Sequence, residues 1–61
     1  NEEIAYWTAV GLANSGRLEE SLPKFRQVFD RNPNWREMTS RLFDGGQMTV
    51  DGEGLKRILS V

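Results

Sequence analysis

Two short segments carry the side chains best suited to recognise a ligand. Tyr6 and Trp7 are adjacent near the amino end, and Asn34, Trp35 and Arg36 form a second run in the middle of the chain. Aromatic faces can stack on sugar rings, an amide can pair with N-acetyl groups, and a guanidinium binds carboxylates in a bidentate manner. These five residues are therefore our candidate binding residues for a glycan or glycopeptide.

The same aromatic residues also fit a hydrophobic core. Trp35 is in line with Met38 and Leu42 at helical spacing, and aromatics in such a stripe pack inward more often than they bind ligands. Tyr6 and Trp7 point about 100° apart on a helix, so at most one of them can face a partner helix of the same hairpin. The other must be exposed, or must contact another element or another domain.

Acid–base and metal chemistry have little support in the sequence. The neighbouring carboxylates Glu19 and Glu20, and likewise Asp51 and Glu53, stand at expected helix starts, where the helix dipole favours negative charge. The segment 51–54 is only faintly similar to a calcium loop, because the alternating oxygen ligands and the terminal glutamate are missing. We therefore expect no catalytic residue, no metal site and no enzymatic activity.

Size and composition narrow the functional classes further. The chain has 61 residues, eight basic and nine acidic side chains, a net charge of -1, and neither cysteine nor histidine. A domain of this size buries only about 60% of its unfolded surface, too little to enclose a large catalytic cavity. The preferred ligands of zinc and the thiol and imidazole groups are absent, so we expect no cofactor. The balanced charge and the short apolar runs predict neither a nucleic-acid nor a membrane partner.

A helical hairpin is expected to position the first segment. Its first helix covers about residues 2–14 with Asn1 as cap, and its apolar residues surround most of the helix, which predicts a central position. A turn over residues 14–16 reverses the chain into a second helix over about 18–31. Pro23 should kink or fray that helix, or else mark a helix that starts at Ser21. The apolar stripe of the second helix consists of Leu18, Leu22, Phe25, Val28 and Phe29.

Two shorter helices are expected to follow. The third covers about residues 35–43, with Asn34 and Glu37 in the spacing of a capping box. Its packing face should carry Trp35, Met38, Leu42 and Phe43. The fourth covers about residues 52–60, with Asp51 as its cap. Its inward residues should be Leu55, Ile58 and Leu59.

The hairpin resembles a tetratricopeptide repeat. Five of its residues fall on characteristic positions of that pattern: Ala9, Leu12, Ser21, Phe25 and Pro33. Ala5 and Thr8 depart from it, because they stand where the pattern has tryptophan and leucine. No second copy follows, and a lone repeat needs neighbours that bury its faces, so the two shorter helices are expected to cap the hairpin.

A closer similarity covers nearly the whole chain. Residues 6–17, 19–23, 25–29 and 32–37 resemble the small C-terminal domain of a bacterial family of unknown function, whose larger N-terminal domain is similar to the Ntn hydrolases. The C-terminal domain of that family is labelled peptidoglycan-binding, and the resemblance implies this role here. The chain opens without Met, which suggests a segment of a longer protein. The segment 47–49 is more polar than the leucine-rich, proline-containing stretch of the family.

We therefore expect a single small all-α domain over residues 1–61, made of a tetratricopeptide-like antiparallel hairpin capped by two short helices. Its expected function is non-catalytic binding of peptidoglycan, or of a related peptide or glycan, in a shallow groove beside Trp35. The alternative is a protein-interaction or oligomerisation module. In that case exposed aromatics dock onto the N-terminal domain of the same protein or onto a second subunit.

Overall fold

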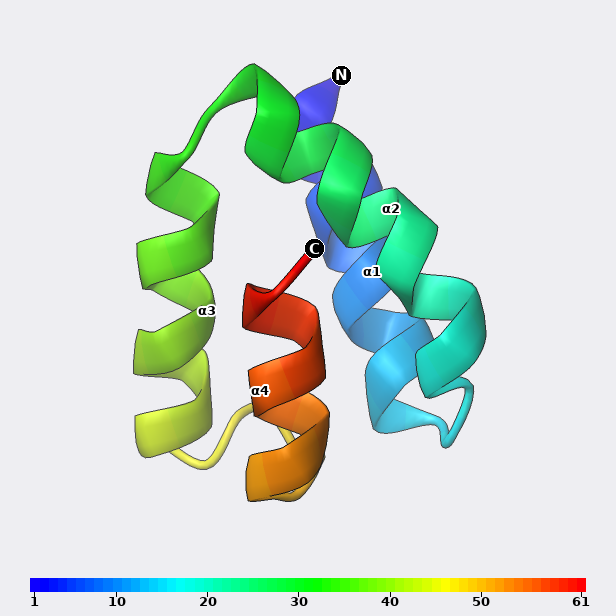
Figure 1. Ribbon diagram of the computed structural model, residues 1–61, viewed down its shortest axis with the longest axis vertical. Coiled ribbons are helices and arrows are strands. Elements are labelled where there is room, and N and C mark those ends of the chain that lie inside the picture. Colours follow the sequence, from blue (N-terminus) through cyan, green and yellow to red (C-terminus); the bar gives the residue numbers. More distant parts are fainter.

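The computed structural model describes all 61 residues as four helices joined by short connections. The helices are α1 (Glu2–Asn14), α2 (Leu18–Arg31), α3 (Asn34–Asp44) and α4 (Gly52–Leu59). Each helix runs antiparallel to the one before it (Figure 1). The predicted all-α fold, a helical hairpin followed by two shorter helices, is confirmed.

Both ends of α1 follow from local sequence. The Asn1 side-chain oxygen accepts hydrogen bonds from the backbone N–H groups of Glu3, at 2.8 Å, and Ile4, at 3.3 Å, as expected for a cap. At the other end Gly16 has a φ of +83°, a conformation that glycine adopts without steric cost. The N–H of Arg17 then donates to the carbonyl of Leu12 at 2.9 Å, which closes the turn into α2.

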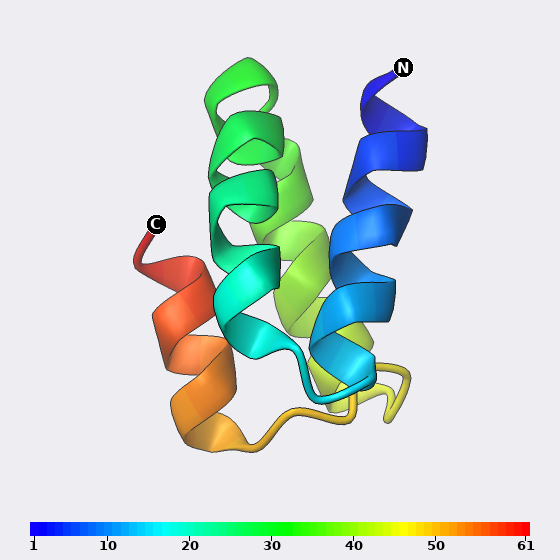
Figure 2. The same cartoon turned by 90° about the vertical axis from the view of Figure 1, so that its right-hand side faces the viewer.

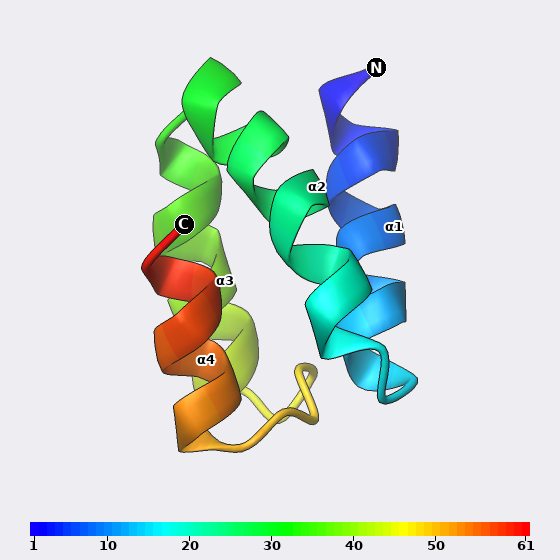
Figure 3. The same cartoon turned by 45° about the vertical axis from the view of Figure 1, so that its right-hand side comes forward.

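The centre of the bundle is occupied by α2, which packs against each of the other three helices. In contrast, α1 stands at one edge, and the side of α1 turned away from α2 faces no other helix (Figures 2 and 3). The expectation of a central α1 was therefore wrong. Apolar residues surround α1, but only one side of it finds neighbours within the chain.

Pro23 lies inside α2, which forms one helix from Leu18 onward. The alternative start at Ser21 is therefore wrong. Proline has no N–H, so the carbonyl of Glu19 lacks its usual helical donor. The expected apolar stripe is confirmed, because three of its members are buried and the other two pack against the core: Phe25, Val28 and Phe29, then Leu18 and Leu22.

The start of α3 differs from the predicted capping box. Pro33, with a φ of -60°, occupies the cap position, and Asn34 is already the first helical residue. The side chain that contributes is Asn32, whose oxygen accepts a hydrogen bond from the N–H of Asn34 at 3.1 Å. The preceding proline already holds a helical φ, so the helix can begin one residue earlier than the asparagine cap implied.

The packing face of α3 also differs from the prediction. Met38 is 37% exposed, whereas Thr39 is fully buried. Thr39 tolerates burial because its hydroxyl donates to the carbonyl of Trp35 at 2.8 Å and shares a second hydrogen bond, at 2.9 Å, with Tyr6. Leu42 is buried as expected.

The connection from α3 to α4 closes the bottom of the core. The amide of Asn14 donates to the carbonyl of Gln47 at 3.1 Å, and its oxygen accepts from the N–H of Thr49 at 2.8 Å. Between these contacts Met48 is buried. Asp51 caps α4 as predicted, by accepting from the N–H of Gly54 at 2.8 Å. The buried apolar core consists of Tyr6, Ala9, Val10, Ala13, Phe25, Val28, Phe29, Leu42, Met48 and Ile58.

Candidate interaction surface

Tyr6 lies in the middle of the core and has no exposed surface. Its ring stacks on that of Trp35, with centroids 4.5 Å apart and an interplanar angle of 26°. The hydroxyl of Thr39 uses its only proton on the carbonyl of Trp35, so Tyr6 is the donor in the Tyr6–Thr39 hydrogen bond. Burial raises the pKa of Tyr6. Although the sequence made Tyr6 a candidate binding residue, its position leaves no surface for a ligand.

Trp35 joins three helices at the upper end of the bundle. Its indole N–H donates to a carboxylate oxygen of Glu2 at 3.0 Å, and the amide of Asn32 donates to the same oxygen at 3.4 Å. These two bonds, the bond from Trp35 first, lower the pKa of Glu2. The indole is partly buried and packs against the core. Trp35 therefore connects the start of α1, the end of α2 and the start of α3.

Arg36 points away from the other candidates. Its guanidinium donates to the main-chain oxygen of Val61 at 2.7 Å and lies 5.1 Å from the centroid of the Phe29 ring. Asn34 and Trp35 do share a hollow of about 300 Å³ on the outer side of α3, which is open to solvent and is completed by Glu37, Met38 and Arg41. Of the five predicted binding residues, only these two line one depression.

The remaining candidate, Trp7, belongs to a different surface, which we call the outer face of α1 and define by Ile4, Trp7, Thr8 and Gly11. Ile4 is 67% exposed and Trp7 is 44% exposed, the two largest exposures among the bulky apolar residues. The rings of Trp7 and Tyr6 contact each other in a T-shaped arrangement, with centroids 5.2 Å apart and an interplanar angle of 74°. Trp7 thus contacts the core through Tyr6 and is also partly exposed to solvent.

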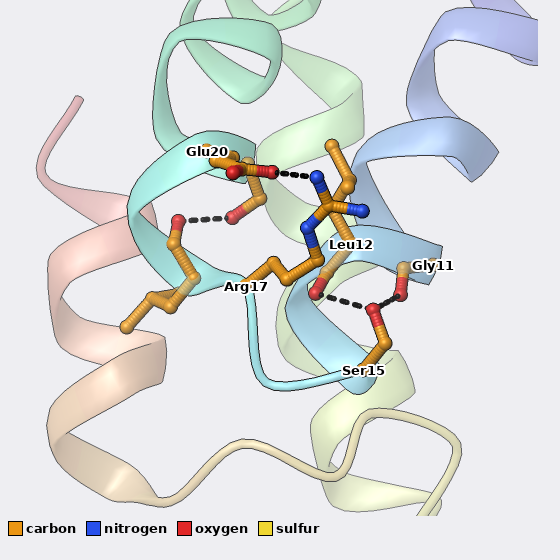
Figure 4. Close-up of polar contacts among 7 residues, drawn as sticks. Gly11, Leu12, Ser15, Arg17 and Glu20 are labelled. Atoms are coloured by element: carbon orange, nitrogen blue, oxygen red, sulfur yellow. Dashed lines mark hydrogen bonds and ion pairs between the residues drawn. The ribbon is translucent and has the colours of Figure 1, made fainter.

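Polar groups on this side of α1 are turned toward their own helix. The hydroxyl of Thr8 donates to the carbonyl of Ile4 at 2.9 Å. The hydroxyl of Ser15 shares its single proton between the carbonyls of Gly11 and Leu12, at 2.9 and 3.1 Å (Figure 4). No charged side chain occurs from residue 4 to residue 16. The outer face of α1 therefore offers apolar surface and few free hydrogen-bonding groups.

A charged residue lies at each end of this face, Glu3 at the amino end and Arg17 after the carboxyl end. Glu3 is exposed at the amino end of α1. Arg17 follows the carboxyl end and forms an ion pair with Glu20 at 2.6 Å, in which both side chains are more than half exposed (Figure 4). Such a surface pair is weak, so the guanidinium can be shared with another partner at little cost.

Two further carboxylates, those of Glu19 and Glu37, form surface ion pairs. Glu19, in the first turn of α2, pairs with Arg57 of α4, and the hydrogen bond from that guanidinium lowers the pKa of Glu19. Glu37 pairs with Arg41 at 2.7 Å. No group of three acidic, histidine or cysteine side chains is placed to hold a metal ion. None of the helices has the length and the apolar composition required to cross a membrane.

The fold and the surface define a small four-helix domain with one unpartnered apolar helix face. Comparisons with protein-family models, with curated proteins and with solved structures found no match. The function must therefore be argued from the exposed residues of this chain.

Proposed function

We propose that the domain is a non-catalytic interaction module that binds a protein partner through the outer face of α1. The observation that carries this proposal is the exposure of Ile4 and Trp7, which lie one helical turn apart. Exposed large apolar residues that adjoin one another are uncommon on a domain that has no partner. Tryptophan is also the residue most enriched among those that dominate binding energy at protein interfaces.

The core supports this proposal because none of its ten buried apolar residues belongs to the outer face of α1. Every buried side-chain nitrogen and oxygen has a hydrogen-bond partner. The residues that α1 contributes to the buried apolar cluster, Tyr6, Ala9, Val10 and Ala13, all lie outside its outer face. A helix that only had to cover one side of this core would carry polar residues opposite it. The apolar composition of the outer face is thus explained by a contact outside the chain.

The experiment is photo-crosslinking in cells that produce the protein. A photo-reactive amino acid replaces Trp7 in one variant and Lys24, an exposed residue of α2, in a matched control. We expect discrete adducts from position 7 that disappear when Ile4→Lys is added, and none from position 24. Equal adducts from both positions, or none from position 7, would contradict the proposal.

A second candidate function is binding of a peptidoglycan fragment or a similar peptide in the hollow on α3. What favours it is the juxtaposition of an amide, an indole and a guanidinium, those of Asn34, Trp35 and Arg41, around one depression. The resemblance to a domain labelled peptidoglycan-binding points in the same direction. Titration with muropeptides, followed by amide chemical shifts, should perturb α3 and should fail in Asn34→Ala and Arg41→Ala. Unchanged spectra would exclude this ligand.

A further inference from the structure

The outer face of α1 carries a large exposed side chain, Trp7, and a residue without a side chain, Gly11. Trp7 is 44% exposed on it, whereas at Gly11, four residues later on the same side, a Cβ would meet no atom within 4 Å apart from its chain neighbours and the backbone of its own helix. Glycine is the least favourable residue in a helix after proline, and no packing contact within the chain explains its presence here. An element outside the chain that approaches the backbone at Gly11 would explain it.

A second copy of α1 fits both features. Trp7 and Gly11 are about 6 Å apart along the helix axis. If two copies of α1 pack antiparallel around a two-fold axis midway between these positions, the indole of each copy lies over the glycine of the other. Parallel packing would instead place Trp7 against Trp7. In a two-fold dimer both copies contribute the same surface. One Trp7 and one Gly11 on each copy are therefore enough to form both halves of the contact.

The charges at the two ends favour the same arrangement. Antiparallel packing brings Glu3 of each copy near Arg17 of the other, whereas parallel packing would place Glu3 beside Glu3. Complementary charges at the rim of an interface set orientation and disfavour the wrong one. Shape and charge therefore select the same relative orientation of the two helices.

We infer that the partner of the outer face of α1 is a second copy of the chain, bound as an antiparallel two-fold dimer with each Trp7 seated on the other copy's Gly11. This inference rests on the proposed function, since it names the partner of that surface. The contact is small, because α1 is about 20 Å long and stable interfaces bury about 800 Å² on each partner. The dimer is consequently weak, and the domain exchanges between monomer and dimer.

Sedimentation equilibrium of the whole chain, from the low micromolar to the millimolar range, tests the inference. We expect a reversible monomer–dimer equilibrium that Gly11→Ala weakens about tenfold or more, because a methyl group then stands at position 11 in both halves of the contact. Trp7→Gln should weaken it similarly. The control Lys24→Gln, on exposed α2 surface, should leave it unchanged. The inference would be overturned if the chain stays monomeric, or if the dissociation constant of the dimer is unchanged in Gly11→Ala and Trp7→Gln.

A charge-reversal experiment tests the orientation. Glu3→Arg alone and Arg17→Glu alone should each weaken dimerisation about threefold to tenfold, because each introduces two like-charge contacts. An equimolar mixture of the two variants should recover heterodimers, since both contacts between unlike copies are again attractive. A mixture that associates no better than its components would exclude the antiparallel arrangement. If the chain is monomeric but position 7 crosslinks to a different protein, the dimer is excluded while the interaction module stands.

Discussion

The two sides of α1 are built from similar residues and do different things. The inner side holds four buried residues: Tyr6, Ala9, Val10 and Ala13. The outer side holds Ile4 and Trp7, which are as apolar but exposed. The inner side includes two small alanines, Ala9 and Ala13, whereas these two exposed residues of the outer side are bulky. Apolar character alone therefore does not determine which side of this helix faces the core.

Hydrogen bonding separates the two sides more clearly. The Tyr6 hydroxyl on the inner side bonds across to Thr39 of α3 at 2.9 Å. On the outer side, the hydroxyls of Thr8 and Ser15 bond only to carbonyls of the same helix. A hydrogen bond between two helices fixes their relative position, whereas a hydrogen bond within one helix does not. The comparison implies that the inner side determines stability and that the outer side is free for association.

Removing the largest inner side chain should have the largest effect on stability. Tyr6→Ala removes a fully buried ring and should cost about 3–5 kcal/mol of unfolding free energy. A domain of 61 residues has about 3–9 kcal/mol in total, so much of the population should unfold. Urea denaturation followed by circular dichroism measures the change. Ile4→Ala, on the outer side, should stay within about 0.5 kcal/mol of the parent; similar losses in both variants would remove the distinction between the sides.

Enlarging a small inner residue should have the next largest effect. Ala9 is fully buried, so Ala9→Leu overfills the core around it and should cost about 1–3 kcal/mol. Thermal denaturation would show a lower midpoint. Ala5→Leu is the matched control, because Ala5 belongs to the same helix and is exposed. A stable Ala9→Leu variant would mean that the packing around Ala9 is looser than its burial indicates.

A substitution on the outer side should stabilise the monomer. A Cβ at Gly11 meets open space, so Gly11→Ala should gain up to about 1 kcal/mol through helix propensity. The measurement is a denaturant titration at low protein concentration, where the chain is monomeric. Gly16→Ala is the contrasting variant, because the φ of +83° at Gly16 strains any residue with a side chain and the change should destabilise. Loss of stability in Gly11→Ala would place that residue in an intramolecular contact.

Local signals allowed most of the fold to be predicted. The caps at Asn1 and Asp51, the turn at Gly16 and the apolar stripe of α2 each depend on residues within a few positions, and all are confirmed. The misplaced cap of α3 shows the limit of such signals. Asn32 and Asn34 are equally good capping residues, and the φ of Pro33 between them decided which one acts.

Features that depend on packing between helices could not be predicted. The burial of Thr39 requires Tyr6 to approach from α1, and the burial of Met48 requires Asn14 to hold the loop around it. The sequence limited Tyr6 and Trp7 to one inward residue, but the choice depended on where α3 lies. A usable signal for Thr39 was its position four residues after Trp35, on the same side of α3.

The smallest expected effect is a change in the pH dependence of stability when Glu2 is replaced. Hydrogen bonds from Trp35 and Asn32, assisted by the charges of Arg31 and the amino terminus, lower the pKa of Glu2 below its ordinary 4.5. A carboxyl whose pKa is lower in the folded state contributes stability above its unfolded pKa, and that contribution is lost as the pH falls through the folded value. Glu2→Gln should therefore be less stable than the parent at neutral pH and should converge with it in acid.

Urea midpoints measured from neutral pH to below 4.5 should decline less steeply in Glu2→Gln than in the parent. Parallel declines in the parent and Glu2→Gln would mean that the bonds from Trp35 and Asn32 do not favour the charged carboxylate. In that case the upper end of the bundle would be held by packing of the indole alone, and the inner side of α1 would stabilise the fold without any help from charge.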